Sequence, residues 1–203
     1  VLFSCGFIVN FVLGGITGVA LAQVPFDVHV HDTYFVVAHF HYIVYGGSVF
    51  VIFASIYHWY PKVTGRLMNE HLGRFHFLLT FVGFNLCFAP QHWLGLNGMP
   101  RRVAEYDPQF QLINQFSSVG ALLMAISTLP FLWNVIASAS RGAIAGDNPW
   151  NALTPEWLTT SPPPVENWKG EPPLVSNPYA YGTPDDEIDL RSVSGSDLWR
   201  NGQ

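Results

Sequence analysis

The stretch HDTYFVVAHFHYIVYGGSVFVIFASIYHWYP, residues 31–61, decides the fold of this 203-residue chain. No Asp, Glu, Lys or Arg occurs between Thr33 and Pro61, and this run is longer than the roughly 20 residues that a helix needs to cross a bilayer. Two histidines, His39 and His41, lie inside it. We therefore predict a membrane-spanning helix that carries two imidazoles between its ends.

The spacing of the two histidines argues against a shared metal ion. Successive residues of an α-helix are rotated by about 100°, so side chains at i and i+2 point in nearly opposite directions. Two histidines that chelate one ion from a helix are spaced as in HExxH. Because a haem iron takes an axial imidazole on one face, the pattern favours a wall between two haems, with Phe40 between His39 and His41. The alternative is that each imidazole hydrogen-bonds a neighbouring helix.

Charge divides the chain into two parts. Nine of the 15 prolines and nine of the 14 acidic residues, but only four of the nine bases, follow residue 140, in pieces such as SPPP at 161–164 and EPP at 171–173. We predict an all-α membrane region at 1–140 with four transmembrane helices, and a polar, irregular, Pro-rich tail at 141–203 on the cytoplasmic side. The four spans are expected in the charge-free runs 1–26, 33–61, 75–100 and 108–140.

Basic residues near the span ends predict the orientation. Four of them would share one side of the membrane with the tail, and only Arg101 and Arg102 would lie on the other side, near residues 27–32. The first run lacks an initiator Met, a basic flank and a cleavage site, so we expect no signal peptide and a start inside a longer protein. Membrane lipid, and no nucleic acid, is expected around the helices. The four bases are Lys62, Arg66, Arg74 and Arg141.

Three sequence pieces resemble one known family. The run HDTYFVVAHFHY at 31–42 is similar to the tenth membrane helix of subunit I of cytochrome c oxidase, a haem-copper terminal oxidase. The runs HWYPKVTGRLMNE at 58–70 and FAPQHWLGLNGMPRR at 88–102, with the apolar run after them, are similar to its eleventh and twelfth helices, in the same order. The resemblance covers residues 1 to about 140. It makes the four expected helices equivalent to the last four of a twelve-helix bundle.

The resemblance implies a role for each histidine. His41 would be an axial ligand of the low-spin haem a, and His39 the catalytic, proximal ligand of the high-spin haem a3, where oxygen binds opposite a copper ion. Phe40 would link the two sites. The implied activity is the reduction of dioxygen to water by an aa3-type oxidase with electrons from cytochrome c, coupled to proton translocation. The copper ligands lie outside this sequence, so the fragment alone would be inactive.

The resemblance also implies partners and a second metal at the outer end. Arg101 and Arg102 would pair with haem propionates, and Asp27 would lie near a propionate of the high-spin haem. His31 and Asp32 would help hold a magnesium or manganese ion with a ligand from subunit II, although imidazole alone suggests manganese or zinc. The alternatives are an arginine pair solvated by headgroups and an Asp32 that only caps the helix. The resemblance also implies subunit III as a partner chain, and it implies a location in a respiratory membrane such as the bacterial plasma membrane.

Three other functions compete with this interpretation. A quinol-oxidising relative would share the HFH motif, but that group resembles this chain less at Asp32 and Tyr42. A simple dihaem carrier pairs histidines about 13 or 14 residues apart on each of two helices, a spacing absent here. A bundle without a cofactor would use both histidines as interhelical hydrogen bonds. The remaining histidines are expected at span ends, with no assigned chemistry: His58, His71, His76 and His92, while His29 stays unassigned.

Overall fold

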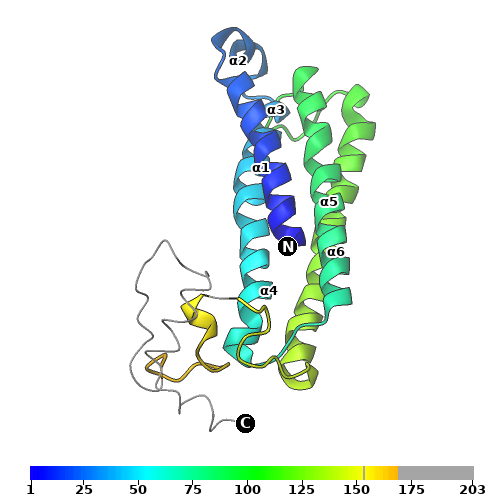
Figure 1. Ribbon diagram of the computed structural model, residues 1–203. Helices are drawn as coiled ribbons and strands as arrows, with labels where there is room; N and C mark the ends of the chain where they lie inside the picture. The colour runs from blue at the N-terminus through cyan, green and yellow to red at the C-terminus, as the bar shows by residue number, and fades with distance from the viewer. Residues whose placement is uncertain (153, 169–203) are drawn as a thin grey trace. The chain divides into compact units, whose positions relative to one another are not determined.

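The structure is a computed structural model that describes residues 1–152 and 154–168, and this part of the chain is helical without a strand (Figure 1). A π-helical turn, η1 (Tyr45–Val49), joins two of the helices without a break. Two short 3₁₀ turns are η2 (Pro108–Phe110) and η3 (Pro155–Trp157). The α-helices are α1 (Leu2–Leu21), α2 (Val24–Val30), α3 (Tyr34–Val44), α4 (Phe50–Thr64), α5 (Glu70–Leu96) and α6 (Gln111–Arg141).

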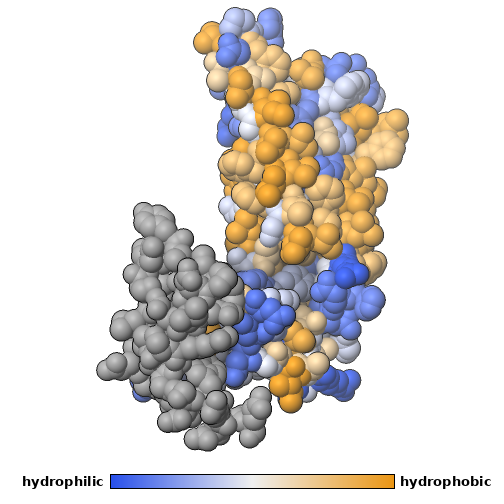
Figure 2. All heavy atoms as spheres, viewed as in Figure 1, coloured by the Kyte–Doolittle hydropathy of each residue, from blue (hydrophilic) through white to orange (hydrophobic). Residues whose placement is uncertain are grey.

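Four helical segments are long and apolar enough to cross a membrane, which confirms the predicted number and fold class. Each overlaps one charge-free run of the sequence. The second is continuous through α3, η1 and α4, so the two histidines lie in its first half. Figure 2 shows apolar side chains over the sides of the helices and hydrophilic residues at the end that carries α2. The segments are Leu2–Leu21, Tyr34–Thr64, Glu70–Leu96 and Pro108–Arg141.

The chain forms two compact units. The first contains Val1–His58 and Asn69–Ala137, and the second contains Trp59–Met68 with the chain from Ser138 onward. The predicted boundary after residue 140 stays a prediction. The EPP piece at 171–173 lies outside the described residues.

Aromatic side chains fill the core of the first unit, where α3 packs against α1 and α5. Phe50 and Phe84 are fully buried, and Tyr42 is nearly so. The helices approach closely where glycines occur: a Cβ at Gly46 of η1 would lie 2.8 Å from the Cβ of Asn10 in α1. Small residues at such contacts are typical of membrane helices, because they let two backbones come together.

The loop between α5 and α6 is fixed to the start of α3. The Tyr34 backbone N–H donates to the Met99 carbonyl at 3.0 Å, and the Arg101 N–H donates to the Asp32 carbonyl at 2.9 Å. Met99 is fully buried, and it packs with Leu94. These contacts hold Arg101 beside Asp32 at the end of the bundle that carries α2.

The described part of the tail is irregular, as predicted, but it is anchored within the second unit. The Lys62 ammonium donates to the carbonyls of Asp147 at 3.0 Å and Thr159 at 2.7 Å, and it lies 5.1 Å from the centre of the Trp157 ring. Lys62 is only 5% exposed. Carbonyl and aromatic partners compensate for part of the hydration that this cation loses.

Candidate functional site

The two histidines of α3 contact two different helices. His39 meets α1, where its Nδ1 lies 3.0 Å from the Gly14 carbonyl oxygen and 3.0 Å from the Thr17 hydroxyl oxygen. His41 meets α5, where its ring stacks on Phe88 with centroids 4.1 Å apart and planes inclined by 15°. The i, i+2 spacing therefore has the consequence expected of it, since each imidazole has its own neighbour.

The contacts of His39 define its tautomer. A backbone carbonyl only accepts hydrogen bonds, so the short approach of Nδ1 to the Gly14 oxygen requires a proton on Nδ1. A neutral imidazole then has an unprotonated Nε2. This nitrogen is the one that His39 offers to a ligand.

The same reasoning applies to His41 with a local partner. Its Nδ1 lies 2.7 Å from the carbonyl oxygen of Val37, one turn earlier in the same helix. Nδ1 therefore carries the proton and Nε2 is again the free acceptor. The Phe40 ring, 40% exposed, lies 4.4 Å from the His41 ring, centroid to centroid.

Two glycines of α1 let it approach α3 closely, and one of them, Gly18, makes space for His39; sequence reasoning missed both. A Cβ at Gly18 would lie 2.9 Å from Cε1 of His39, and a Cβ at Gly14 would lie 2.8 Å from Cδ1 of Ile43. Their spacing, Gly-xxx-Gly in an apolar helix, was the available signal for a close helix pair. Thr17 and Phe88 were also missed as neighbours of the histidines, because only the tertiary structure brings them there.

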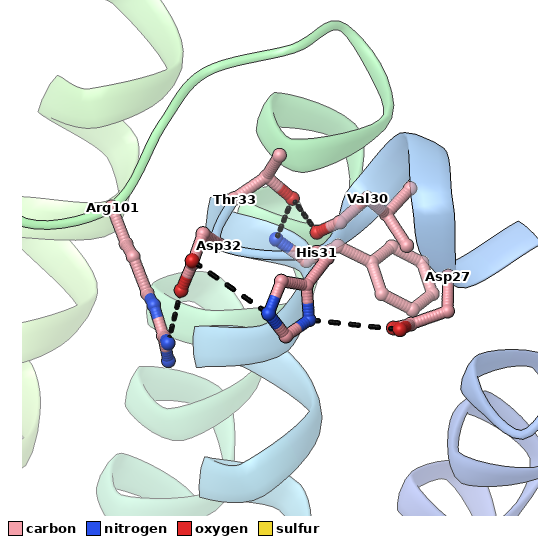
Figure 3. A network of polar contacts seen from close by, with 7 residues as sticks. Asp27, Val30, His31, Asp32, Thr33 and Arg101 are labelled. Atoms are coloured by element: carbon pink, nitrogen blue, oxygen red, sulfur yellow. Dashed lines mark hydrogen bonds and ion pairs between the residues drawn. The ribbon is translucent and has the colours of Figure 1, made fainter.

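A polar network lies at the start of α3 (Figure 3). The His31 ring stands between two carboxylates, with Nδ1 3.6 Å from Asp27 and Nε2 3.7 Å from Asp32. Arg101 forms an ion pair with the other oxygen of Asp32. The hydrogen bond from Arg101 is the largest of the influences that hold the pKa of the Asp32 carboxyl below its usual value, so this group is anionic at neutral pH.

Thr33, rather than Asp32, caps α3, so the cap alternative for Asp32 is wrong. The Thr33 hydroxyl oxygen accepts from the Phe35 N–H at 3.2 Å. Asp32 has a left-handed backbone with φ of 59°, which turns its side chain toward Arg101 (Figure 3). Arg102 also has a left-handed backbone conformation, with φ of 63°.

His76 corrects a further expectation. It was expected as a polar tip at a span end, but it is fully buried in α5 among aromatic rings, with Nδ1 3.1 Å from the Tyr57 hydroxyl oxygen. Only Nδ1 has a hydrogen-bond partner among the described residues, because Nε2 is buried without one. His76 therefore belongs to the core of the first unit.

No three His, Cys, Asp or Glu side chains of the described residues converge on a point as a metal site.

One family matches most of the membrane region. Its description is cytochrome C and quinol oxidase polypeptide I, and it matches residues 1–123, which include both histidines and the arginine pair. The chain belongs to this family. The four spans accordingly make it part of an integral, multi-pass membrane protein.

Curated relatives extend the likeness into the tail. Cytochrome c oxidase subunit 1 of Thermostichus vulcanus is 58% identical over 181 residues, which cover 89% of this chain and 33% of that protein. The probable cytochrome c oxidase subunit 1-beta of Nocardia farcinica is 51% identical over 184 residues, with 89% and 31% covered. The chain thus spans about a third of the length of these relatives.

A solved structure has a similar helix arrangement. A haem-copper terminal oxidase dimer determined by cryo-EM matches with a TM-score of 0.62 and 26% identity, over 70% of this chain and 27% of that one. The family implies haem and copper cofactors in general. His39 and His41 fit a haem iron, because each Nδ1 is engaged and each Nε2 is free to coordinate.

Proposed function

We propose that the chain supplies four membrane helices of the catalytic subunit of an aa3-type cytochrome c oxidase. His39 is the proximal ligand of the high-spin haem a3, and His41 is an axial ligand of the low-spin haem a. The observation that carries the proposal is the pair of imidazoles on two sides of α3, each bonded at Nδ1 and free at Nε2. The complex reduces dioxygen to water and translocates protons in a bacterial plasma membrane or another respiratory membrane.

Bound haem supplies the redox-active iron, and the residues of this chain set its ligands and surroundings. The Gly14 carbonyl and the Val37 carbonyl fix the tautomers of His39 and His41, so that the coordinating nitrogen needs no proton loss before it binds iron. Phe40 lies in the short stretch of α3 between the two ligands. The helix backbone therefore keeps the two haem sites at a fixed spacing.

The arginine pair and Asp27 form the proposed propionate site at the outer end. Arg101 is 22% exposed in its side chain and already neutralised in part by Asp32, so it would share its guanidinium between that carboxylate and a propionate. Arg102, which has a left-handed backbone conformation, would serve as the second cation. Asp27 lies one helical turn before His31 and would lie near a propionate of the high-spin haem.

His31 and Asp32 are proposed ligands of a magnesium or manganese ion completed by subunit II. Manganese supplied during growth of cells with the full-length complex should give an electron paramagnetic resonance signal with nitrogen coupling. Asp32→Asn should greatly weaken that signal, because a hard cation depends on anionic oxygen ligands. Glu105→Gln, which removes a charge from the neighbouring loop, should leave it intact. Undiminished manganese in Asp32→Asn would exclude this acid as a ligand.

Cytochrome c is the proposed electron donor, with subunits II and III as the partner chains. The names of the curated relatives support this choice, although the family description covers quinol oxidases as well. Asp32 and Tyr42, the positions at which the quinol group resembles this chain less, favour the same donor. Steady-state oxygen consumption with reduced cytochrome c, compared with ubiquinol, tests it. Turnover with ubiquinol alone would overturn cytochrome c as the proposed donor, but it would not affect the proposed haem ligands.

Replacement of each histidine in the full-length complex tests the ligand assignment. His39→Ala should remove high-spin haem, carbon monoxide binding and oxygen reduction. His41→Ala should chiefly change the low-spin absorption band. Retained carbon monoxide binding and turnover in His39→Ala would overturn the proposal.

A further inference from the structure

The hydroxyl of Thr17 lies between α1 and the imidazole of His39. Its Oγ1 is 2.9 Å from the Gly14 carbonyl oxygen and 3.0 Å from Nδ1 of His39, and that same Nδ1 is 3.0 Å from the Gly14 oxygen. Three polar atoms from Gly14, Thr17 and His39 are therefore mutually within hydrogen-bond distance. The contact joins residues 22 positions apart in the sequence.

The donors and acceptors of this group can be assigned. The Gly14 carbonyl only accepts, so it takes the Thr17 hydroxyl proton and faces the Nδ1–H of His39. With its own proton directed to Gly14, the Thr17 oxygen presents a lone pair to Nδ1–H. The imidazole proton thus lies between two acceptors, a carbonyl and a hydroxyl.

A local explanation accounts for only part of this geometry. Threonines in helices commonly donate to a carbonyl three or four residues earlier, and Thr17 does so with Gly14. That bond does not require a second contact with a residue of α3. The second contact exists because Gly14 and Gly18, on either side of Thr17, let α1 approach α3 and leave the His39 ring no room on the Gly18 side.

We propose that Thr17 is a positioning residue of the high-spin haem site, which together with the Gly14 carbonyl fixes the plane of His39 and strengthens its Nε2 as a ligand. The inference rests on the proposed role of His39 as the proximal ligand. A hydrogen bond from Nδ1–H raises the basicity of the coordinating nitrogen, and acceptors beyond the ligand itself tune a metal in this way. Two acceptors at Nδ1 hold the ring against rotation better than one.

Resonance Raman spectroscopy of the reduced full-length complex tests the inference through the iron–histidine stretching band. Thr17→Val keeps the shape of the side chain and removes the hydroxyl, so the band should shift to lower frequency and the reduction potential of the high-spin haem should rise. Thr17→Ser keeps the hydroxyl and should keep the wild-type band. Thr80→Val removes a buried hydroxyl from α5, where Thr80 donates to the His76 carbonyl, and should leave the band in place.

Several results would overturn the inference. An unshifted band in Thr17→Val, an equal shift in Thr17→Ser, or the same shift in Thr80→Val would each do so. If Thr17→Val does not assemble, Thr17→Ala gives the same comparison with less bulk, and an unshifted band in that variant would overturn the inference equally. A band that persists in His39→Ala would instead refute the proximal role of His39, which separates failure of the proposed function from failure of this inference.

Discussion

The two sides of α3 hold their imidazoles by different means. Toward α1, His39 meets a carbonyl and a hydroxyl of another helix, in space that a glycine leaves open. Toward α5, His41 rests on an aromatic ring, and its Nδ1 bonds within its own helix. The tautomer of His41 is therefore a local property of α3, whereas both the tautomer and the orientation of His39 depend on how α1 packs. Changes in α1 should affect one site and changes in α5 the other.

Phe88→Ala should have the largest effect and act on the His41 side. Phe88 is 8% exposed and part of the aromatic core, so its loss should leave a cavity and lower the stability of the complex by about 3–5 kcal/mol. The low-spin absorption band should broaden, while carbon monoxide binding persists in the folded fraction. Thermal unfolding and optical spectra measure both. Phe75→Ala, at a position 51% exposed in the same helix, should cost within about 0.5 kcal/mol.

Gly18→Ala should act on the His39 side. A Cβ there would lie 2.9 Å from Cε1 of a ring whose Nδ1 is already bonded, so the imidazole must leave its position. Displacement of a ligand's support typically costs about 10–100-fold in activity or metal affinity. Carbon monoxide titration should reveal this loss with an unchanged low-spin band. Gly15→Ala, in the same helix but facing open space, is the matched control. An equal loss of carbon monoxide binding in Gly18→Ala and Gly15→Ala would contradict a specific role of Gly18 in the support of His39.

Arg102→Gln should sharpen the comparison through charge. A cation near a propionate favours the reduced haem, so its removal should lower the reduction potential of the low-spin haem. One charge-assisted contact at this exposed position is worth about 1 kcal/mol, or about 40 mV for one electron. Redox titration of the full-length complex provides the value. Arg74→Gln removes a guanidinium that pairs with Glu70 at the start of α5, and it should leave the potential unchanged.

Thr33→Ala should have the smallest effect and should not distinguish the two sides. It removes the cap of α3, whose hydrogen bond to the Phe35 N–H is 3.2 Å long, and should cost about 0.5–1 kcal/mol of stability. Thr33→Ser should restore most of it. Both haem bands should respond equally, because the start of α3 precedes both histidines. A selective loss at one haem would mean that the helix start, rather than the neighbouring helices, sets the difference.

The sequence predicted the four spans because the absence of charge over more than 20 residues is a property of each segment alone. The same applies to the opposite directions of His39 and His41, which follow from helix rotation. Other features depend on contacts between distant segments. The partnership of His39 with Gly14 and Thr17 arises from α1 packing on α3, and no periodicity in either helix indicates which atoms meet.

Two errors have specific physical causes. Asp32 and Thr33 are both good capping residues in adjacent positions, and only the backbone conformation decides between them. His76 was expected near a membrane surface because it lies close to Arg74 in the sequence. The helix α5 begins at Glu70, however, so His76 lies about two turns inside it and reaches the aromatic core.

The π-helical turn η1 links the length of the chain to the direction of its side chains. Such a turn accommodates one residue more than an α-helical turn, so every residue of α4 is rotated by about 100° from where an uninterrupted α-helix would place it. In-frame loss of a single codon among those for Tyr45–Val49 would convert the segment to a regular helix. Both the histidines and the side chains of α4 would then keep their directions, because the residue lost is the extra one of the turn, and Phe50 and Phe53 would still face the core that they now fill. For the gene, this five-residue segment is thus the place in the second span where the loss of one codon is closest to neutral, whereas the same loss within α4 would rotate the residues after it by about 100°.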